Sequence, residues 1–155
     1  MNTSDGNVTL RVHAIDVSGS TSDGPGVRAL VFLQGCVRHC PGCHNRATWA
    51  LDGGKAMKVD EVVAIICASH INRVTISGGE PLLQPKGVMA LVREFKAKGV
   101  DDICLYTGFS AGEVPNYILE SLKGQWLKTG EFRLSEKTTT QPFVGSRNQD
   151  FRRVA

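Results

Sequence analysis

Hydrophobic and polar positions change their period repeatedly along the chain, and each change predicts a different element. Short apolar or partly alternating runs predict strands at residues 8–18, 27–33, 74–77, 103–106 and 126–128. Apolar positions at helical spacing predict helices at residues 59–70, 85–98 and 115–122. Residues 36–58 and the chain beyond residue 130 show neither period, so we expect both stretches to be loops.

The order of these elements predicts an α/β fold with a largely parallel sheet, because helices and strands alternate after the first two strands. Functional loops in such sheets lie at the carboxyl ends of the strands. A cysteine-rich loop, a Gly78-Gly79 loop and a Thr107-Gly108 loop each follow a predicted strand. We therefore expect them to meet at one edge of the sheet and form a single site. The length fits one domain, residues 1–155, with fewer strands than a full eight-stranded barrel.

The composition is that of an ordinary soluble globular protein, with 41% hydrophobic and 21% charged residues. The net charge of +3 is small and the basic residues are scattered, so nucleic-acid binding is not expected. No run approaches the ~20 apolar residues of a membrane span, and residues 1–7 lack the pattern of a signal peptide. An odd number of cysteines, five, favours metal binding in a reducing cytoplasm over a disulfide framework.

Cys36, Cys40 and Cys43 form the pattern C-x3-C-x2-C. Thiolates are soft ligands that suit iron–sulfur clusters or zinc. Closed zinc sites and electron-transfer clusters normally take four protein ligands. A four-iron cluster held by three cysteines would therefore leave one iron free to bind a substrate or cofactor. Cys67 or Cys104 could supply a fourth thiolate, but each lies in an apolar pattern that is typical of a buried core cysteine.

Other kinds of site remain open at this point. His39 and His44 could complete a zinc site with the cysteines, although zinc motifs usually come as two separated ligand pairs. An iron–sulfur electron carrier or a zinc-binding adaptor is therefore the alternative from a different functional class. The number of clustered cysteines argues against both.

The segment Ser77-Gly78-Gly79-Glu80-Pro81 continues from the strand predicted at residues 74–77. Glycines let a ligand approach the backbone closely and leave N–H donors unhindered, and the Glu80 carboxylate could bind an ammonium group. Taken alone, the segment would be an ordinary turn between a strand and a helix. Its predicted place beside the cysteine loop makes a ligand-binding role the stronger interpretation.

The cysteine pattern and the Gly-Gly-Glu-Pro segment together resemble the radical S-adenosylmethionine superfamily. More narrowly, three segments resemble the glycyl-radical enzyme activases: Asp-Gly-Pro-Gly-Val-Arg at 23–28, Phe-Leu-Gln-Gly-Cys at 32–36 and Cys-His-Asn-Arg-Ala-Thr-Trp at 43–49. The resemblance extends from about residue 16 to residue 149. It implies a partial, open (βα) barrel, a [4Fe-4S] cluster and S-adenosyl-L-methionine as cofactors.

Two branches of these activases compete. Pro41-Gly42, the segments 106–109 and 127–132, and Gly-Ser-Arg-Asn-Gln at 145–149 resemble the anaerobic ribonucleoside-triphosphate reductase activating protein, as does the short chain. His-Asn-Arg at 44–46 and Gly-Gly-Lys at 53–55 are more similar to pyruvate formate-lyase activating enzymes. We favour the first branch.

The resemblance also implies roles for individual residues. Cys36, Cys40 and Cys43 would bind the cluster. The cofactor contacts would be Gly42, Cys43, His44, Ser77, Gly78, Gly79, Glu80 and Thr107. The protein would reductively cleave S-adenosylmethionine and remove a hydrogen atom from a glycine of a partner glycyl-radical enzyme, with a flavodoxin- or ferredoxin-like electron donor. No side chain is expected to act as an acid or base, because the cofactors carry the chemistry.

Two departures from the family pattern bear on the site. Gly42 stands where many members have an aromatic residue before the third cysteine, so only backbone contact with the cofactor is expected there. Tyr106-Thr107 stands where the formate-lyase branch has an Asp-Thr pair beside a cation, which leaves no clear basis for a cation site. Residues 23–28 and 145–153 are candidates for contact with the partner, although the first could be no more than a tight turn.

Overall fold

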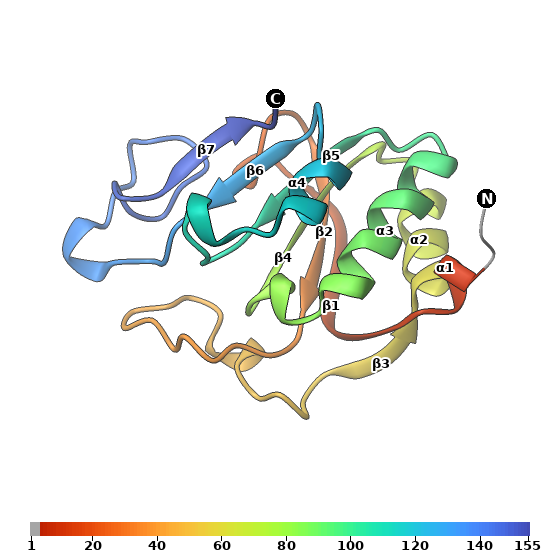
Figure 1. Ribbon diagram of the computed structural model, residues 1–155, viewed down its shortest axis with the longest axis horizontal. Helices are drawn as coiled ribbons and strands as arrows, with labels where there is room; N and C mark the ends of the chain where they lie inside the picture. Colours follow the sequence, from red (N-terminus) through yellow and green to blue (C-terminus); the bar gives the residue numbers. More distant parts are fainter. Residues whose placement is uncertain (1–3) are drawn as a thin grey trace.

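A computed structural model describes residues 4–155 of the chain. Residues 1–3, which belong to the expected single domain, lie outside the described residues. One seven-stranded sheet forms the framework, in the order β3-β1-β2-β4-β5-β6-β7 (Figure 1). The strands are β1 (Thr9–Ser20), β2 (Arg28–Leu33), β3 (Lys55–Lys58), β4 (Arg73–Gly78), β5 (Asp102–Tyr106), β6 (Trp126–Thr129) and β7 (Asp150–Arg153).

The centre of the sheet is parallel and its flanks are antiparallel. β2, β4, β5 and β6 pair in parallel, whereas β1 runs antiparallel to β2 and β3, and β7 runs antiparallel to β6. The order ends at β3 on one side and at β7 on the other, so the sheet of the described residues stays open. The predicted α/β fold with an open, largely parallel sheet is confirmed.

Helices cover one face of this sheet. They are α1 (Ser4–Asn7), α2 (Val59–Ala68), α3 (Pro85–Ala97) and α4 (Asn116–Ser121). Short 3-10 helices follow several loops: η1 (Arg46–Thr48), η2 (Pro81–Leu83), η3 (Ala111–Glu113) and η4 (Leu134–Glu136). No helix within residues 4–155 has the length and apolar character needed to span a bilayer.

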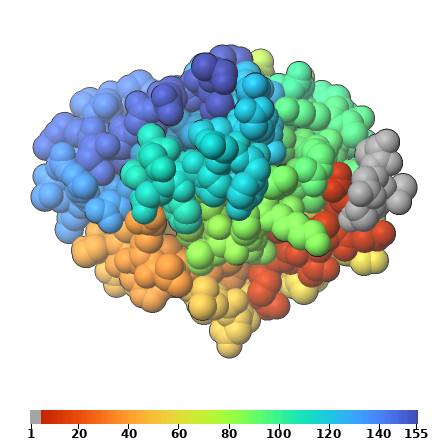
Figure 2. All heavy atoms as spheres, in the orientation of Figure 1, coloured from red at the N-terminus to blue at the C-terminus, as the bar shows by residue number. Residues whose placement is uncertain are grey.

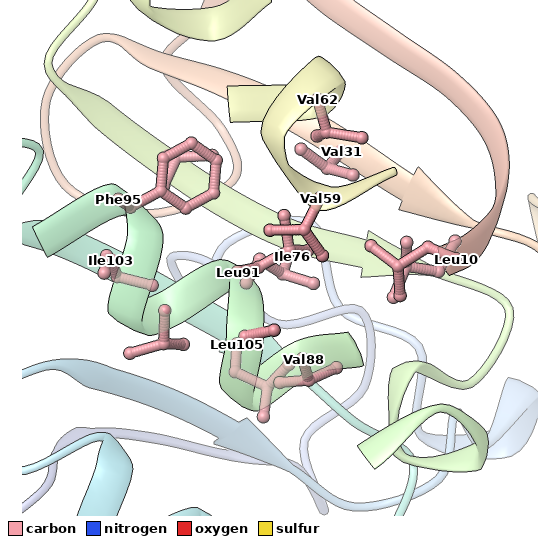
Figure 3. Packing of buried hydrophobic residues seen from close by; sticks show 14 of the residues in the cluster. Leu10, Val31, Val59, Val62, Ile76, Val88, Leu91, Phe95, Ile103 and Leu105 are labelled. Atoms are coloured by element: carbon pink, nitrogen blue, oxygen red, sulfur yellow. The ribbon is translucent and has the colours of Figure 1, made fainter. Parts of the chain in front are cut away.

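The main hydrophobic core lies between α2, α3 and the sheet. Val59 and Val62 of α2 and Leu91 of α3 pack against Val31 and Ile76 of the central strands (Figure 3). All of these side chains are almost completely buried. Because side chains alternate along a strand, their neighbours in sequence point to the opposite face of the sheet. That opposite face is free to build a site.

A buried arginine at the start of β2 links several segments on the opposite face of the sheet. The guanidinium of Arg28, which is fully buried, lies 3.0 Å from the Asp102 carboxylate and donates to the hydroxyl of Thr75 at 2.9 Å. It also donates to the carbonyl of Pro25 at 2.7 Å. The turn at residues 23–28 is therefore held against this face of the sheet, and the buried side chain of Arg28 is closed to any partner.

Two strands arise where the sequence predicts loops. β3 carries lysines at both of its ends, and β7 reads Asp-Phe-Arg-Arg. Both are edge strands, where charged residues face solvent and discourage pairing with another sheet. Each of these strands has too few apolar residues to show the alternation of apolar and polar positions by which a strand is predicted.

Candidate active site

The cysteine loop leaves the carboxyl end of β2 and closes on itself at its base. The amide of Cys36 donates to the carbonyl of Trp49 at 3.1 Å. The buried side-chain amide of Gln34 donates to the carbonyls of Ala47 at 3.1 Å and Ala50 at 2.8 Å. The two limbs of the loop are thus held together by backbone and carboxamide hydrogen bonds before any metal binds.

The thiols of this loop are free and partly shielded. Cys36 is buried, whereas Cys40 and Cys43 are half-buried. Burial raises the pKa of the Cys40 thiol, the neighbouring Cys36 and Cys43 raise it further, and a hydrogen bond from the Phe132 backbone opposes the rise. Metal binding must therefore displace a proton here, and the positive charge of the metal stabilises the thiolate.

The donor set fits an iron–sulfur cluster, because three thiols, the ligands that such clusters take, border one cavity. Within residues 4–155, no three side chains of His, Cys, Asp and Glu converge closely enough to hold one ion. Each cysteine of an iron–sulfur cluster binds a different iron, so its ligands stand farther apart than those of one zinc ion.

The Gly78-Gly79 loop packs directly against the cysteine loop. The amide of Gly79 donates to the carbonyl of Leu33 at 3.0 Å, and the amide of Glu80 donates to the carbonyl of Gly35 at 2.7 Å. A Cβ at Gly78 would overlap the backbone of Leu33, and one at Gly79 would overlap the carbonyl of Gly35. These glycines therefore allow two loops to approach, a role that the sequence alone did not suggest.

The Glu80 carboxylate joins the loops that follow β4 and β5. It is 1% exposed and accepts hydrogen bonds from the Thr107 hydroxyl at 2.6 Å, the Gly108 amide at 2.7 Å and the Leu82 amide at 3.0 Å. The Arg38 guanidinium of the cysteine loop lies 4.0 Å away. The predicted convergence of the three loops is confirmed. Glu80 orients these loops at the cavity wall, with both of its oxygens already engaged by protein groups.

These loops surround a cavity of about 700 Å³ on the face of the sheet opposite the helices. This volume falls within the ~300–1,000 Å³ that is typical of small-molecule sites. The cavity is bordered by nine of the residues predicted for the site: Cys36, Cys40, Cys43, His44, Ser77, Gly78, Gly79, Glu80 and Thr107. Thiols for a cluster and space for a second ligand therefore occur together.

Gly42 is the one predicted contact that does not border the cavity. Its backbone has φ +76°, and a Cβ at this position would lie 2.9 Å from the side chain of Leu134. An aromatic residue could not occupy this position without displacing Leu134. Backbone contact between Gly42 and a cofactor remains a prediction.

Lys128 and Tyr106 border the cavity as well, and the sequence did not single out Lys128. The Lys128 ammonium lies 4.5 Å from the centre of the Tyr106 ring. Burial lowers the pKa of Lys128, while Cys104, Glu80 and Asp23 act to raise it. A polar residue at the end of the strand predicted at 126–128 was the available signal.

Tyr106 adds a polar group that the protein itself does not satisfy. Its hydroxyl is buried and has no hydrogen-bond partner among the described residues. Burial is also the main cause that raises the pKa of this phenol. The hydroxyl can therefore donate to, or accept from, a ligand in the cavity.

The two remaining cysteines lie outside the cavity. Cys104 is fully buried on β5, and burial raises the pKa of its thiol to about 12. Cys67 lies on α2 and packs against the hydrophobic core. Both were predicted to be core residues, and the structure confirms it.

A cluster loop of three thiols beside a ligand cavity, on an open α/β sheet, defines an iron–sulfur protein of a kind that can bind a second molecule. Residues 22–152 match the family model described as "4Fe-4S single cluster domain". The chain belongs to this family.

Curated relatives include both kinds of activating protein that the motifs resemble. The chain is 36% identical to the pyruvate formate-lyase-activating enzyme of Clostridium pasteurianum, over 66% of this chain and 45% of the relative. It is 37% identical to the pyruvate formate-lyase 1-activating enzyme of Escherichia coli K12, over 64% and 42%. It is 38% identical to the anaerobic ribonucleoside-triphosphate reductase-activating protein of Salmonella typhimurium, over 59% and 65%.

The aligned region thus spans less than half of the formate-lyase relatives and about two thirds of the reductase relative. The family and these relatives agree with the expected [4Fe-4S] cluster and S-adenosyl-L-methionine. Among solved structures, QueE from Escherichia coli superimposes with a TM-score of 0.64 over 84% of this chain and 63% of that one. At 18% identity this likeness concerns the fold.

Proposed function

We propose that this chain is a glycyl-radical enzyme activase that uses a [4Fe-4S] cluster and S-adenosylmethionine to remove a hydrogen atom from a glycine of a partner enzyme. One observation carries the proposal: the three cysteine thiols and the Gly78-Gly79-Glu80 loop border the same cavity. An electron-transfer site needs no such space beside its cluster. The similarity to two kinds of activating protein supports the same activity.

The cluster and S-adenosylmethionine, when bound, supply one-electron cleavage of a carbon–sulfur bond and the hydrogen abstraction that follows. The chain's own residues bind and orient. Cys36, Cys40 and Cys43 would hold the cluster. The Lys128 ammonium, which borders the cavity beside the Tyr106 ring, would attract an anionic group of the cofactor. The loops joined through Glu80 would keep these groups in register and exclude water.

We further propose the anaerobic ribonucleoside-triphosphate reductase as the partner. The segments at 106–109, 127–132 and 145–149 resemble its activating protein, and the match covers a larger share of that relative than of the formate-lyase enzymes. A flavodoxin- or ferredoxin-like protein would supply the electron. Pyruvate formate-lyase is the second candidate, because its activating enzymes are equally similar in sequence.

Anaerobic reconstitution tests the activity. The reconstituted protein, given dithionite and S-adenosylmethionine, should release 5′-deoxyadenosine, and it should generate a glycyl radical, seen by electron paramagnetic resonance, on the reductase. A radical on pyruvate formate-lyase alone would correct the partner. A complete cluster without cleavage in the presence of either enzyme would indicate an electron carrier, and a colourless protein with stoichiometric zinc would indicate an adaptor.

A further inference from the structure

Residues 138–145, Thr-Thr-Thr-Gln-Pro-Phe-Val-Gly, form a loop that we call the flap. Lys137 and Ser146 form an isolated antiparallel bridge at its base. The amide of Thr138 donates to the carbonyl of Gly145 at 3.0 Å, and the amide of Arg147 donates to the carbonyl of Glu136 at 2.8 Å. The flap is therefore a closed hairpin-like loop whose two limbs cannot separate freely.

Gln149 fixes this base to the end of β6. Its side-chain oxygen accepts from the amides of Gly145 at 2.8 Å and Ser146 at 3.2 Å, and its side-chain nitrogen donates to the carbonyl of Gly130 at 2.9 Å. Gln149 is only 6% exposed. Within residues 145–153, the candidate segment for partner contact, Ser146 and Gln149 are thus buried supports of the flap, whereas Arg147 is exposed. Contact of this segment with a partner stays a prediction.

The tip of the flap is held by fewer contacts than its base: the Thr138 hydroxyl accepts from the amides of Thr140 at 3.3 Å and Gln141 at 3.4 Å. Within the described residues, the backbone carbonyls of residues 138–144 accept no hydrogen bond from another protein group. The ring of Phe143 packs on that of Phe151, with centroids 5.0 Å apart. Phe143 has φ +66°, a left-handed conformation that costs a non-glycine residue roughly 1–3 kcal/mol. A hydrogen-bonded base thus presents a tip whose backbone carbonyls accept no hydrogen bond from the described residues.

This tip borders the same cavity as the cluster cysteines. Thr138, Thr139, Gln141 and residues 142–145 line it, together with Thr21, Ser22 and Asp23 from the turn after β1. Thr140 lies in the flap but does not line the cavity. In Figure 2 the lighter blue segment that begins near residue 130 adjoins the orange cysteine loop on one surface.

The chemistry of the flap favours one class of occupant. Residues 138–145 carry hydroxyl and carboxamide groups and no charge. Such groups both donate and accept hydrogen bonds, which matches the neutral N–H and C=O groups of a peptide backbone. A nucleic acid or an acidic peptide would favour cations, and the cations nearest in sequence, Lys137 and Arg147, lie at the base of the flap and not in residues 138–145.

We propose that the flap is the docking surface for the extended, glycine-containing segment of the partner enzyme, and that Thr139 and Gln141 hydrogen-bond to its backbone. This inference rests on the proposed activase function. A glycine has no side chain to recognise, so contacts to the neighbouring peptide groups must align it. A flap on a fixed base, beside the cluster, is suited to this alignment.

Adjacent threonines provide a matched test. In the reconstituted protein, the double variant Thr139→Ala/Gln141→Ala should raise the KM for the activated enzyme, reductase or formate-lyase, about tenfold. Its kcat should change less than twofold, because the cofactor contacts stay. Thr140→Ala should keep the wild-type KM. Iron content and unfolding midpoint of each variant would show that the fold is intact.

Direct binding separates this inference from the proposed function. The dissociation constant of each reconstituted variant for the reductase and for pyruvate formate-lyase, measured anaerobically without S-adenosylmethionine, should follow the same order as KM. Flap-dependent binding without a glycyl radical would overturn the proposed function and keep the docking surface. Equal affinity of wild type and double variant, or an equal loss in Thr140→Ala, would overturn the docking surface. Wild-type protein that binds neither enzyme would overturn both.

Discussion

Glu80 shows how a single carboxylate can hold a site together from inside its wall. Three N–H or O–H donors point at its two oxygens, and they come from η2 and from the loop after β5. Buried acceptors of this kind stabilise a fold only while their donors match them. The sequence presents Glu80 as a ligand for a cofactor amine, whereas in the structure its carboxylate connects two loops by hydrogen bonds.

Replacing Glu80 by glutamine tests how much these hydrogen bonds stabilise the fold. One oxygen would become an NH₂ group that faces a protein donor, so we expect Glu80→Gln to lower the free energy of unfolding by about 1–3 kcal/mol. The measurement is urea unfolding of the apo protein. Glu120→Gln is the control, because Glu120 is exposed and pairs only with Lys123 on the surface. Equal stability of wild type and Glu80→Gln would refute the structural role.

The cysteines make a second prediction at the residue scale. Cys36→Ala, Cys40→Ala and Cys43→Ala should each lose the cluster, because a four-iron cluster with two protein ligands is poorly held. Cys67→Ala and Cys104→Ala should keep iron near the wild-type content, since both thiols lie outside the cavity. Iron analysis and the visible spectrum after anaerobic reconstitution measure both. Iron loss in Cys67→Ala would overturn the ligand assignment.

At the scale of elements, the site depends on how closely the loops after β2 and β4 approach. Gly78 has φ +124°, and its missing Cβ points at the backbone of Leu33. The neighbouring Gly79 faces the carbonyl of Gly35 in the same way. A parallel pair of strands thus delivers two loops in contact, and glycine is required wherever backbone meets backbone.

Alanine substitutions measure this requirement. Gly78→Ala should cost about 3 kcal/mol or more, because it combines a left-handed backbone with overlap against an atom that cannot move aside. Gly112→Ala is the matched control, because nothing lies within 4 Å of its Cβ position and its φ is negative. Thermal unfolding of the apo proteins compares the two. Similar midpoints for both variants would show that the loops can separate.

At the scale of the whole molecule, the sheet separates the hydrophobic core on one face from the cavity on the other. Helices bury one face in a hydrophobic core, and the other face carries the cavity. The edge of the core is closed by an ion pair, in which the Arg93 guanidinium of α3 donates twice, at 2.8 Å, to the Asp5 carboxylate of α1. That pair ties the first helix to the rest of the domain.

The Asp5–Arg93 pair predicts a pH dependence of stability. The hydrogen bonds from Arg93 hold the pKa of Asp5 below its usual value of 3.8, so its ionised form stabilises the fold. This contribution is complete above the ordinary pKa and is lost as the pH falls through the lower, folded value. Asp5→Asn should therefore cost about 1 kcal/mol at pH 7, since Arg93 is half exposed.

The difference between wild type and Asp5→Asn should shrink below about pH 4, as Asp5 takes up its proton. Urea unfolding at a series of pH values from 7 to 3 measures it. Asp150→Asn offers a comparison, because Asp150 and its partner Arg152 are both exposed. A constant difference across the whole series would mean that the charge of Asp5 has no part in the effect.

Much of the architecture could be predicted from local patterns. The strand at Arg28–Leu33 and the helix at Pro85–Ala97 carry apolar periods that only one kind of element satisfies. β3 and β7 were not predicted, because edge strands tolerate charged residues on both faces. The roles of Lys128 and Gln149 were not predicted either, because their partners Tyr106 and Gly130 are distant from them in the sequence.

The sequence by itself determined the number and spacing of the thiols and the glycines that allow a close turn, because both follow from residues adjacent in the chain. Tertiary structure decided the rest. Parallel strands carried the cysteine loop, the Gly78 loop and Thr107 to one edge, where Glu80 joins them. It also placed the flap at the cavity that the cysteines border, through the fold of residues 130–149. Such contacts between distant segments exist only once the sheet has formed.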